Sequence, residues 1–340
     1  MIFSIIIPYS QDYPAIWFTL QDKWLRLSEN YDWQDYEIII VNNGSTGDNL
    51  ELARRMVGLD MTDPSKYSDG RTKTRNKSRR NLTYIEIKDQ LHAKAAINIG
   101  AWKAKGKYHV HCDSHVLFNN DWLTLAEDFM DNNESCGILH SSVTWNYRVT
   151  DVRAYQYFLG VDEYGNRNKF NILGGWSTKK QADKPYRIAA SGTCGLVTRG
   201  DRYRDLYKGY PSQLRGYSGG EPYLELLTWM MGDEVYVHPD MITTHFACTR
   251  SRGYHQGGPY VLARNNMLSW YILGGEKWCD VILDDILEKN KTRPNREKLF
   301  REMREEAVRM GRFRRKYVEE NCVYTLEEVF QLFKSQEIIH

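Results

Sequence analysis

The sequence predicts an α/β protein with an open, mainly parallel central sheet flanked by helices, followed by a mostly helical C-terminal extension. Two apolar runs rich in β-branched residues, Phe3–Pro8 and Glu37–Val41, are typical of strands that are buried on both faces. A polar turn and a segment with apolar residues at helical spacing follow each run, as in a βαβ unit. From about residue 261 onward the pattern is mainly helical.

The composition limits the class of protein. With 340 residues, of which 41% are hydrophobic, the chain is long enough for one large domain or one domain with an appendage. The net charge of +2 excludes a general polycation, and six scattered cysteines without a CxxC pair indicate neither a zinc knuckle nor a disulfide framework. No segment approaches the ~18 apolar residues of a membrane span. We therefore expect a cytoplasmic protein with reduced thiols.

The first half of the chain continues the alternation of strands and helices. Its further predicted elements are helices around Ile16–Leu25 and Leu50–Met56, a strand over Leu82–Ile87 and a helix over His92–Trp102. Ligands of such sheets bind beyond the carboxyl ends of the strands, so residues 10–12 and 42–45 should lie on one rim. Lys94 and Asn98 share a helix face and would suit a diphosphate and a base or ribose, unless they are an ordinary solvated pair.

A strand-like run from His109 ends abruptly in Asp113-Ser114-His115. Residues two apart in an extended segment project to the same side. A carboxylate and an imidazole that converge at a strand end suit a cation of the Mn²⁺ type. The alternative is a turn with an aspartate cap and a surface histidine.

The second half carries one further motif and several strand-like runs. In Gly219-Gly220-Glu221, two glycines allow a backbone to approach a ligand closely, and Glu221 stands at a helix start with Pro222 near its first position. The strand-like runs are 137–144, 192–199, 235–239 and 241–246. A polar, glycine-rich loop follows at 249–260, and much of 140–190 cannot be assigned in detail.

Taken in order, these segments resemble a GT-A glycosyltransferase. The N-terminal third, with Ser4–Pro8, Ile40–Ser45 and Lys94–Gly100, is similar to the nucleotide-binding half of glycosyltransferase family 2. From residue 113 the chain looks more like the catalytic domain of the polypeptide N-acetylgalactosaminyltransferases. The shared features there are Asp113-x-His115, Gly219-Gly220-Glu221, His245 followed by a mobile loop, Arg264-Asn265-Asn266 and Trp270. The resemblance covers roughly residues 1–275, and the order of five motifs is more specific than any one of them.

The resemblance implies a fold, a reaction and a site. It implies a GT-A (nucleotide-diphospho-sugar transferase) catalytic domain over 1–260, with a nucleotide-binding half (1–117), an acceptor and sugar half (118–260), and a helical extension (261–340) packed on it. The implied metal ligands for Mn²⁺ (or Mg²⁺) are Asp113, His115 and His245, and the implied catalytic residues are Glu221 and Asp113. The implied contacts to the nucleotide-sugar donor are Pro8, Ser10, Asn42, Asn43, Lys94, Asn98, Asp113, Ser114, Gly220, Glu221, Arg250 and Tyr254.

Two departures from the family pattern bear on the reaction. Most relatives carry an acidic residue that pairs with uracil where this chain has Asn42 and Asn43, although an amide can still accept from a ring N–H, so a UDP-sugar remains the expected donor. Inverting relatives carry an Asp immediately after the Glu as general base, where this chain has Pro222. A retaining reaction is therefore expected, in which the leaving phosphate takes the acceptor proton. Asp233, Glu225 or an unassigned carboxylate could still supply a base.

The acceptor is inferred from charge. Two basic segments, 66–80 and 309–316, in a chain with 23 tyrosines and 10 tryptophans suit phosphates and an unstacked base. With no lectin domain or membrane anchor expected, a hydroxylated DNA base, the acceptor of some bacteriophage enzymes, is the first choice. Surface saccharides, lipid-linked acceptors and protein Ser/Thr are alternatives, and so is a binding module without turnover. A sugar nucleotidyltransferase is disfavoured because residues 8–11 are not a glycine-rich phosphate loop.

Overall fold

A computed structural model gives the three-dimensional structure. It describes residues 1–56, 72–73, 81–145, 153–157, 176–216, 219–246, 259–291 and 294–336. The basic segment 66–80, apart from the backbone of Thr72–Lys73, lies outside the described residues, and so do Arg250 and Tyr254.

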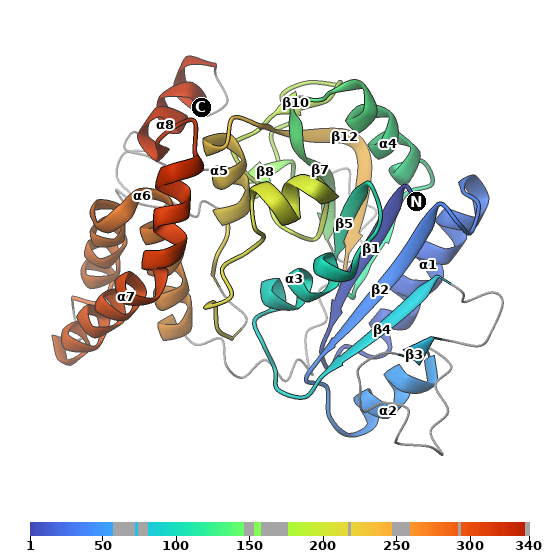
Figure 1. Cartoon of the computed structure of the whole chain (residues 1–340), viewed down its shortest axis with the longest axis horizontal. Coiled ribbons are helices and arrows are strands. Elements are labelled where there is room, and N and C mark those ends of the chain that lie inside the picture. The colour runs from blue at the N-terminus through green and yellow to red at the C-terminus, as the bar shows by residue number, and fades with distance from the viewer. Residues whose placement is uncertain are drawn as a thin grey trace.

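Within the described residues a ten-stranded sheet forms the centre of the molecule (Figure 1). Its strands are β1 (Phe3–Tyr9), β2 (Tyr36–Asn43), β3 (Thr72–Lys73), β4 (Leu82–Ile87), β5 (Tyr108–Cys112), β6 (Val116–Phe118), β7 (Cys136–Trp145), β10 (Tyr186–Arg187), β11 (Gly195–Arg199) and β12 (Glu234–His245). Their order is β10-β12-β7-β11-β5-β1-β2-β4-β3, and β6 pairs with β12. A separate pair is formed by β8 (Gln156–Tyr157) and β9 (Trp176–Ser177).

The predicted α/β class is confirmed, and the parallel pairing is found where the βαβ rhythm indicated it. Strands β4, β2, β1 and β5 run parallel, whereas β11 runs antiparallel to both β5 and β7. The two runs expected at 235–239 and 241–246 are one strand, β12, whose register against β7 shifts between His238 and Ile242. Pro239 lies in this shift and has no N–H to donate to the ladder, which explains the break in the pattern.

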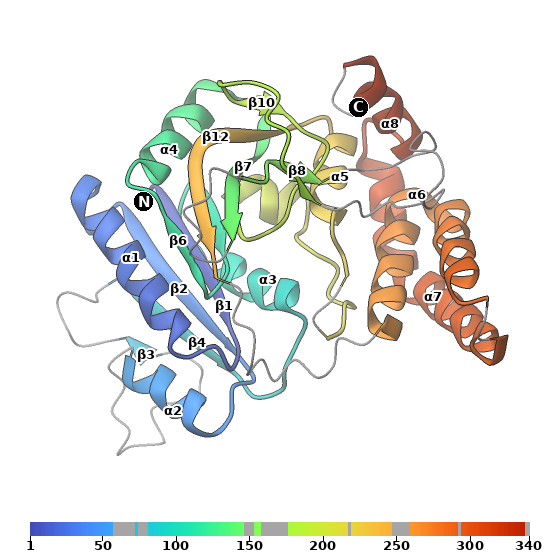
Figure 2. The same ribbon diagram turned by 180° about the vertical axis from the view of Figure 1, so that it is seen from behind.

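Helices cover both faces of the sheet (Figures 1 and 2). They are α1 (Ala15–Asn30), α2 (Gly47–Met56), α3 (Ala93–Lys103), α4 (Trp122–Asn132), the π-helix η3 (Arg202–Leu206), α5 (Tyr223–Met230), α6 (Pro259–Lys289), the 3-10 helix η4 (Pro294–Arg296), α7 (Glu297–Asn321) and α8 (Leu326–Ser335). Strand β1 shows how the apolar runs serve two cores. Ile5 and Ile7 join the cluster that includes α1 and α4, while Ile6 joins the cluster that includes α3 and α5. Side chains alternate along a strand, so both faces of this run must be apolar.

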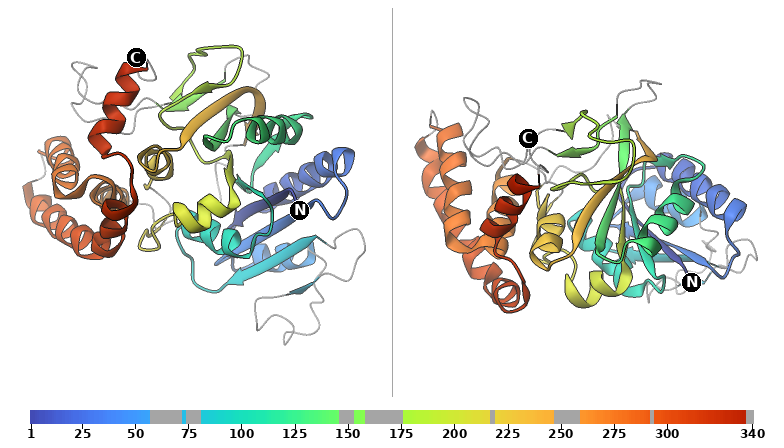
Figure 3. Two further views of the ribbon diagram at one scale, coloured as in Figure 1. Left: turned by 45° about the horizontal axis from the view of Figure 1, so that its top comes forward. Right: turned by 90° about the horizontal axis from the view of Figure 1, so that it is seen from above.

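The helical extension is present as predicted and packs on α5 (Figure 3). Arg314 of α7 donates to the carbonyl of Gly209 (3.0 Å) and to the hydroxyl of Tyr223 (3.1 Å). Arg315 donates to the carbonyl of Ile272 (3.3 Å) and pairs with Glu319. Two arginines of the predicted basic segment 309–316 therefore hold helices together. None of the described helices is long and apolar enough to cross a membrane.

Buried histidines make the stability of this fold depend on pH. His109 and His111 of β5 are both 0% exposed. Burial, followed by the charge of Arg204, lowers the pKa of His109 to about 3, and burial lowers the pKa of His111 well below its usual value. Both rings are therefore neutral in the folded protein, whereas in the unfolded chain they take up a proton below about pH 6.5.

We expect the free energy of unfolding to fall as the pH drops below about 6.5, because the unfolded chain then binds more protons than the folded one. Each buried histidine contributes a slope of up to about 1.4 kcal/mol per pH unit. Urea denaturation at pH 7.5, 6.5 and 5.5 measures the slope, and His109→Gln should make it shallower by up to about 1.4 kcal/mol per pH unit. Equal stability at the three pH values would contradict this account.

Candidate metal and donor site

The Asp113–Ser114–His115 segment lies in a turn between β5 and β6, rather than in an extended strand as the sequence reasoning assumed. The chain must turn here because β5 pairs with β11 whereas β6 pairs with β12. The turn nevertheless brings the two side chains together, with His115 Nε2 3.9 Å from Asp113 Oδ2. Convergence thus comes from the turn and not from strand alternation.

His245 joins these two residues from the end of β12. The antiparallel pairing of β6 with β12 sets His245 opposite Val116, immediately beyond the turn. Its Nε2 lies 3.1 Å from His115 Nε2 and 3.4 Å from Asp113 Oδ2. Ligands at right angles around an ion with bonds of about 2.1 Å are about 3 Å apart, so one carboxylate and two imidazoles at these distances fit a divalent cation. Among the described residues, Asp113, His115 and His245 are the group that could hold a metal.

Asp12, to which the sequence reasoning gave no role, supports this turn. Its carboxylate is 6% exposed, accepts a hydrogen bond from Ser114 Oγ and lies 2.6 Å from His115 Nδ1. The loop that carries Asp12 is fixed by a hydrogen bond from Gln11 N to Ser45 Oγ (3.2 Å). Residues 10–12 and 42–45 were expected on one rim, and this bond joins them.

Helix α1 holds the same turn through polar side chains on its buried face. Thr19 Oγ1 donates to the carbonyl of Ser114 and accepts from the amide of Val116, both at 3.0 Å. Asp22 accepts from the amide of Phe118 (3.0 Å) and pairs with Lys23 (2.6 Å). Thr19 and Lys23 are 0% exposed, and two polar residues four apart on an apolar helix face were a signal in the sequence that could have been noticed.

Glu221 is held at the site by the two glycines before it. Gly219 and Gly220 have φ angles of +90° and +83°, and a Cβ on Gly219 would lie 2.8 Å from Asn265 Cβ. Only glycine suits these positions. Pro222 is the N-cap of α5, next to its first helical residue Tyr223, which agrees with the predicted place of Pro222 near the start of the helix.

Glu221 pairs with Lys94, a residue 127 positions away. Lys94 Nζ lies 2.9 Å from Glu221 Oε1, and Thr193 Oγ1 donates to the same oxygen at 3.3 Å. Lys94 is 4% exposed, so its ammonium group depends on this carboxylate for charge balance. Strand β11 links this pair to the turn Asp113–His115, which is called the metal turn below. Gly195, the first residue of β11, pairs with Cys112, so residues 193 and 194 lie just before the strand and beside Asp113.

Two buried groups nearby stay protonated. Burial, and then the charges of Asp113 and Glu221, raises the pKa of the Cys194 thiol well above its usual value. Burial, and then the charge of Glu225, does the same to the pKa of Tyr210.

The rim asparagines are used within the protein. Asn42 donates to Tyr84 Oη and accepts from the amide of Ser45, while Asn43 binds both the amide and the carbonyl of Leu91 at 2.8 Å. Both are at most 1% exposed. Their amides therefore have a structural use, which the sequence did not indicate. Pro8 and Ser10 lie at the end of β1, where Gln90, another residue not foreseen, donates to Ser10 Oγ at 3.0 Å.

Asn98 likewise serves the protein interior. Its amide donates to the carbonyl of Tyr210 (2.8 Å) and accepts from Tyr203 Oη (2.7 Å), so it does not join Lys94 at Glu221. The two candidate bases are also engaged. Glu225 is 1% exposed and lies 3.3 Å from His140, and Asp233 pairs with Arg202 at 2.6 Å.

Comparison with known proteins decides the family. A model of glycosyl transferase family 2 matches residues 4–187, which is more than half of the 340 residues. The chain belongs to this family. The resemblance drawn from the N-terminal motifs is thereby confirmed.

Solved structures place this glycosyltransferase among GT-A folds. TarS 1–349 of S. aureus, solved in complex with UDP-GlcNAc, has a TM-score of 0.53 and 13% identity, over 86% of this chain and 73% of that chain. GalNAc-T7, solved with UDP, GalNAc and Mn²⁺, has a TM-score of 0.58 and 13% identity, over 90% of this chain and 54% of that chain. At this identity the likeness concerns the fold alone. No curated protein sequence matches the chain significantly.

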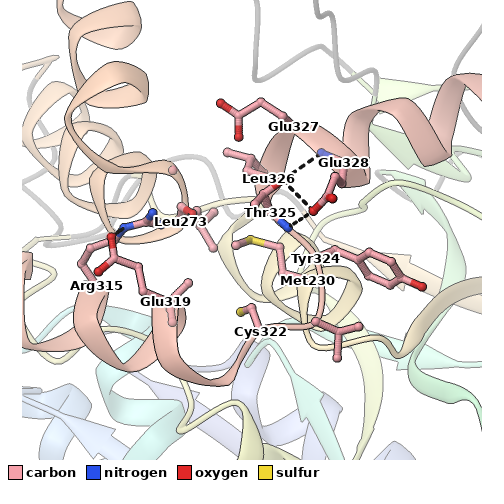
Figure 4. Close-up of a pocket in the computed structure, with 13 residues that line it drawn as sticks. Met230, Leu273, Arg315, Glu319, Cys322, Tyr324, Thr325, Leu326, Glu327 and Glu328 are labelled. Carbon is pink, nitrogen blue, oxygen red and sulfur yellow. Dashed lines mark hydrogen bonds and ion pairs between the residues drawn. The ribbon is translucent and has the colours of Figure 1, made fainter.

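A cavity of about 210 Å³ lies elsewhere, where α8 meets α5, α6 and α7 (Figure 4). Its polar residues have partners within the protein: Arg315 pairs with Glu319, Thr325 with Glu328 in a capping box, and Glu327 with Lys277. Because these pairs fix the helices, we assign this cavity to helix packing.

Proposed function

We propose that this family 2 glycosyltransferase is a metal-dependent, retaining enzyme that transfers a sugar from a UDP-sugar to an acceptor hydroxyl in the cytoplasm. The observation that carries the proposal is the convergence of Asp113, His115 and His245, at 3.1–3.9 Å, near the Lys94–Glu221 pair. The three side chains that can bind a metal therefore lie near the ammonium group of Lys94 and the carboxylate of Glu221. This arrangement suits a diphosphate and a sugar with several hydroxyls.

Each residue of the site has a chemical role in this proposal. Asp113, His115 and His245 would hold the cation, which neutralises the charge that builds on the departing diphosphate. Lys94 balances the charge of Glu221, and Glu221 accepts hydrogen bonds from sugar hydroxyls. Mn²⁺ is the proposed ion, with Mg²⁺ second, because imidazole ligands suit Mn²⁺ better. The complex of GalNAc-T7 with UDP and Mn²⁺ supports this choice.

The uracil ring is proposed to bind at the rim formed by Ser10 and Gln90. Asn42 and Asn43 are committed to Tyr84, Ser45 and Leu91, which removes the amides that the sequence had offered for this purpose. Gln90 is partly exposed and carries an amide that can accept from a ring N–H. The UDP-GlcNAc complex of TarS supports a uridine donor.

Retention is supported by the engagement of the alternative bases. Pro222 follows Glu221, Glu225 is buried beside His140, and Asp233 is paired with Arg202. In the proposed step the acceptor oxygen bonds to the anomeric carbon on the same face that the diphosphate leaves. The bond from that carbon to the diphosphate oxygen breaks with its electron pair, and this oxygen takes the acceptor proton.

The test is incubation with a panel of nucleotide sugars, with and without Mn²⁺, followed by mass spectrometry and by NMR of the first product formed. We expect cleavage of an α-linked UDP-sugar that needs Mn²⁺ and that first yields the α-anomer. A β-anomer as first product would overturn retention, and equal cleavage in EDTA would overturn metal dependence.

For the acceptor we propose a hydroxylated base in DNA, as in bacteriophage DNA modification. Three basic residues of segment 309–316, namely Arg309, Arg312 and Lys316, are exposed on one face of α7 beside Phe313, which is 87% exposed. Cations for phosphates next to an aromatic ring for an unstacked base are the elements of a nucleic-acid surface. Arg314 and Arg315 are excluded from it, since they bind carbonyls within the protein.

Binding to DNA should weaken as salt increases, and charge reversal at Arg309 and Arg312 should weaken it further. A matched control is the double variant Lys298→Glu/Arg301→Glu, which changes the net charge equally on the same helix outside the basic segment. Fluorescence anisotropy at several salt concentrations measures both. No binding, or equal loss in the two double variants, would remove DNA as the acceptor proposed on this surface.

A further inference from the structure

The metal turn contains an arrangement that the family comparison does not address: a buried carboxylate on the far side of a ligand ring. Asp12 lies 2.6 Å from His115 Nδ1, whereas the opposite nitrogen, Nε2, faces Asp113 and His245. The two ring nitrogens thus have separate partners. Asp12 itself is not in the group that could hold the ion.

We propose that Asp12 is a positioning residue, which fixes the tautomer and orientation of His115 so that its Nε2 lone pair is directed at the cation. This inference rests on the proposed metal dependence. A carboxylate can only accept at neutral pH, so the proton of the ring must lie on Nδ1, and Nε2 is left as the ligand atom. Carboxylate partners of this kind also make the imidazole a better ligand.

Burial explains why Asp12 can do this. At 6% exposure, a carboxylate needs hydrogen-bond donors to offset its lost hydration. Two such donors, Ser114 Oγ and His115 Nδ1, come from consecutive residues of the metal turn. Asp12 and the turn therefore fix each other, and Thr19 of α1 holds the backbone of the same turn from the side.

The chain offers a matched control. Asp22 is also a nearly buried carboxylate in the same region, with 8% of its side chain exposed, and it also binds the segment after the turn, through the amide of Phe118. Its partners are Lys23, Arg26 and the amide of Phe118, and none of them is the ring of a metal-ligand candidate. A purely structural role for Asp12 predicts equal effects of Asp12→Asn and Asp22→Asn on the metal.

The first test is titration of the full chain with Mn²⁺ alone, followed by electron paramagnetic resonance of free Mn²⁺. We expect Asp12→Asn to raise the dissociation constant for Mn²⁺ by about 10- to 100-fold. Asp22→Asn should change it by less than about threefold, because Asp22 has no bond to the ring of His115. An unchanged constant in Asp12→Asn, or an equal loss in Asp22→Asn, would overturn the proposal.

The second test needs no variant and no metal. Long-range ¹H–¹⁵N NMR of the histidine-labelled wild-type chain at pH 8 reports which nitrogen of His115 carries the proton. We expect Nδ1–H, and Nε2–H would overturn the proposal. If the wild type fails to bind Mn²⁺, the metal dependence of the proposed function fails, whereas the tautomer still decides the role of Asp12.

Discussion

Replacing Asp113 with alanine should lower Mn²⁺-dependent cleavage of the UDP-sugar by at least about 1,000-fold. Asp113 supplies the only carboxylate in the group formed with His115 and His245, and its Oδ2 lies 3.4 Å from His245 Nε2. Without it two imidazoles remain, and they bring no negative charge to a site that must retain a divalent cation. A bound cation would stabilise the charge on the departing diphosphate by several kcal/mol. Losing that stabilisation slows cleavage by a factor of about 1,000.

The rate of UDP release at saturating Mn²⁺, with thermal unfolding as a check on folding, measures the effect. A suitable control is Asp121→Ala, which removes an exposed carboxylate at the start of α4 that makes no capping hydrogen bond. We expect that variant to keep its rate within about twofold, as surface substitutions usually do. If Asp113→Ala retained cleavage and EDTA had no effect on either protein, the metal-dependent mechanism would be wrong.

The elements of the fold could be predicted because their signals are local. Phe3–Pro8 is apolar on both faces, and in the structure its side chains enter two cores. Turn and loop motifs such as Gly219-Gly220-Glu221 also carried local information, since only glycine suits the positive φ angles that hold Glu221. The prediction that Asp113 and His245 share a metal site came from the order of the motifs in the family, because nothing local in the sequence places the two residues together.

The use of individual polar side chains could not be predicted, because it depends on partners far away in the chain. Asn42 and Asn43 looked like ligand contacts, yet they bind Tyr84 and Leu91 of the neighbouring strand and loop. Asp12 had no visible role because its partner His115 is 103 residues away. A polar residue at a strand end can serve either a ligand or the rim itself, and the sequence does not distinguish the two.

The Lys94–Glu221 pair is the clearest instance of such a distant partnership, and it joins the two halves of the site. Lys94 lies on α3, which precedes β5 in the chain, whereas Glu221 immediately precedes Pro222, the N-cap of α5. The ammonium group is nearly buried and 34% of the Glu221 side chain is exposed, so the carboxylate is the member that can meet a ligand. Lys94 therefore balances the charge of Glu221 from the protein side.

We expect Glu221→Gln to lower kcat/KM for the UDP-sugar by roughly 100-fold, because charged hydrogen bonds contribute about 1.5–3 kcal/mol each and the amide also leaves Lys94 unbalanced. Lys94→Met should cause a similar loss, because the negative charge of Glu221 is then no longer balanced and repels the diphosphate of the donor. The double variant should be no worse than the poorer single variant. Steady-state kinetics of the four proteins gives the coupling free energy, which we expect to be about 2.7 kcal/mol, the equivalent of one 100-fold loss.

A matched pair distinguishes this coupling from general damage to ion pairs. Arg304 and Asp280 are 2.7 Å apart in the helical extension, and Asp280→Asn should leave kcat/KM within about twofold. If the losses in Glu221→Gln and Lys94→Met were simply additive in the double variant, the two residues would act independently. Lys94 would then serve the diphosphate directly, and Glu221 would need another source of charge balance. A coupling near about 2.7 kcal/mol would instead mean that the donor meets one charge-balanced pair, built from α3 and the segment before α5.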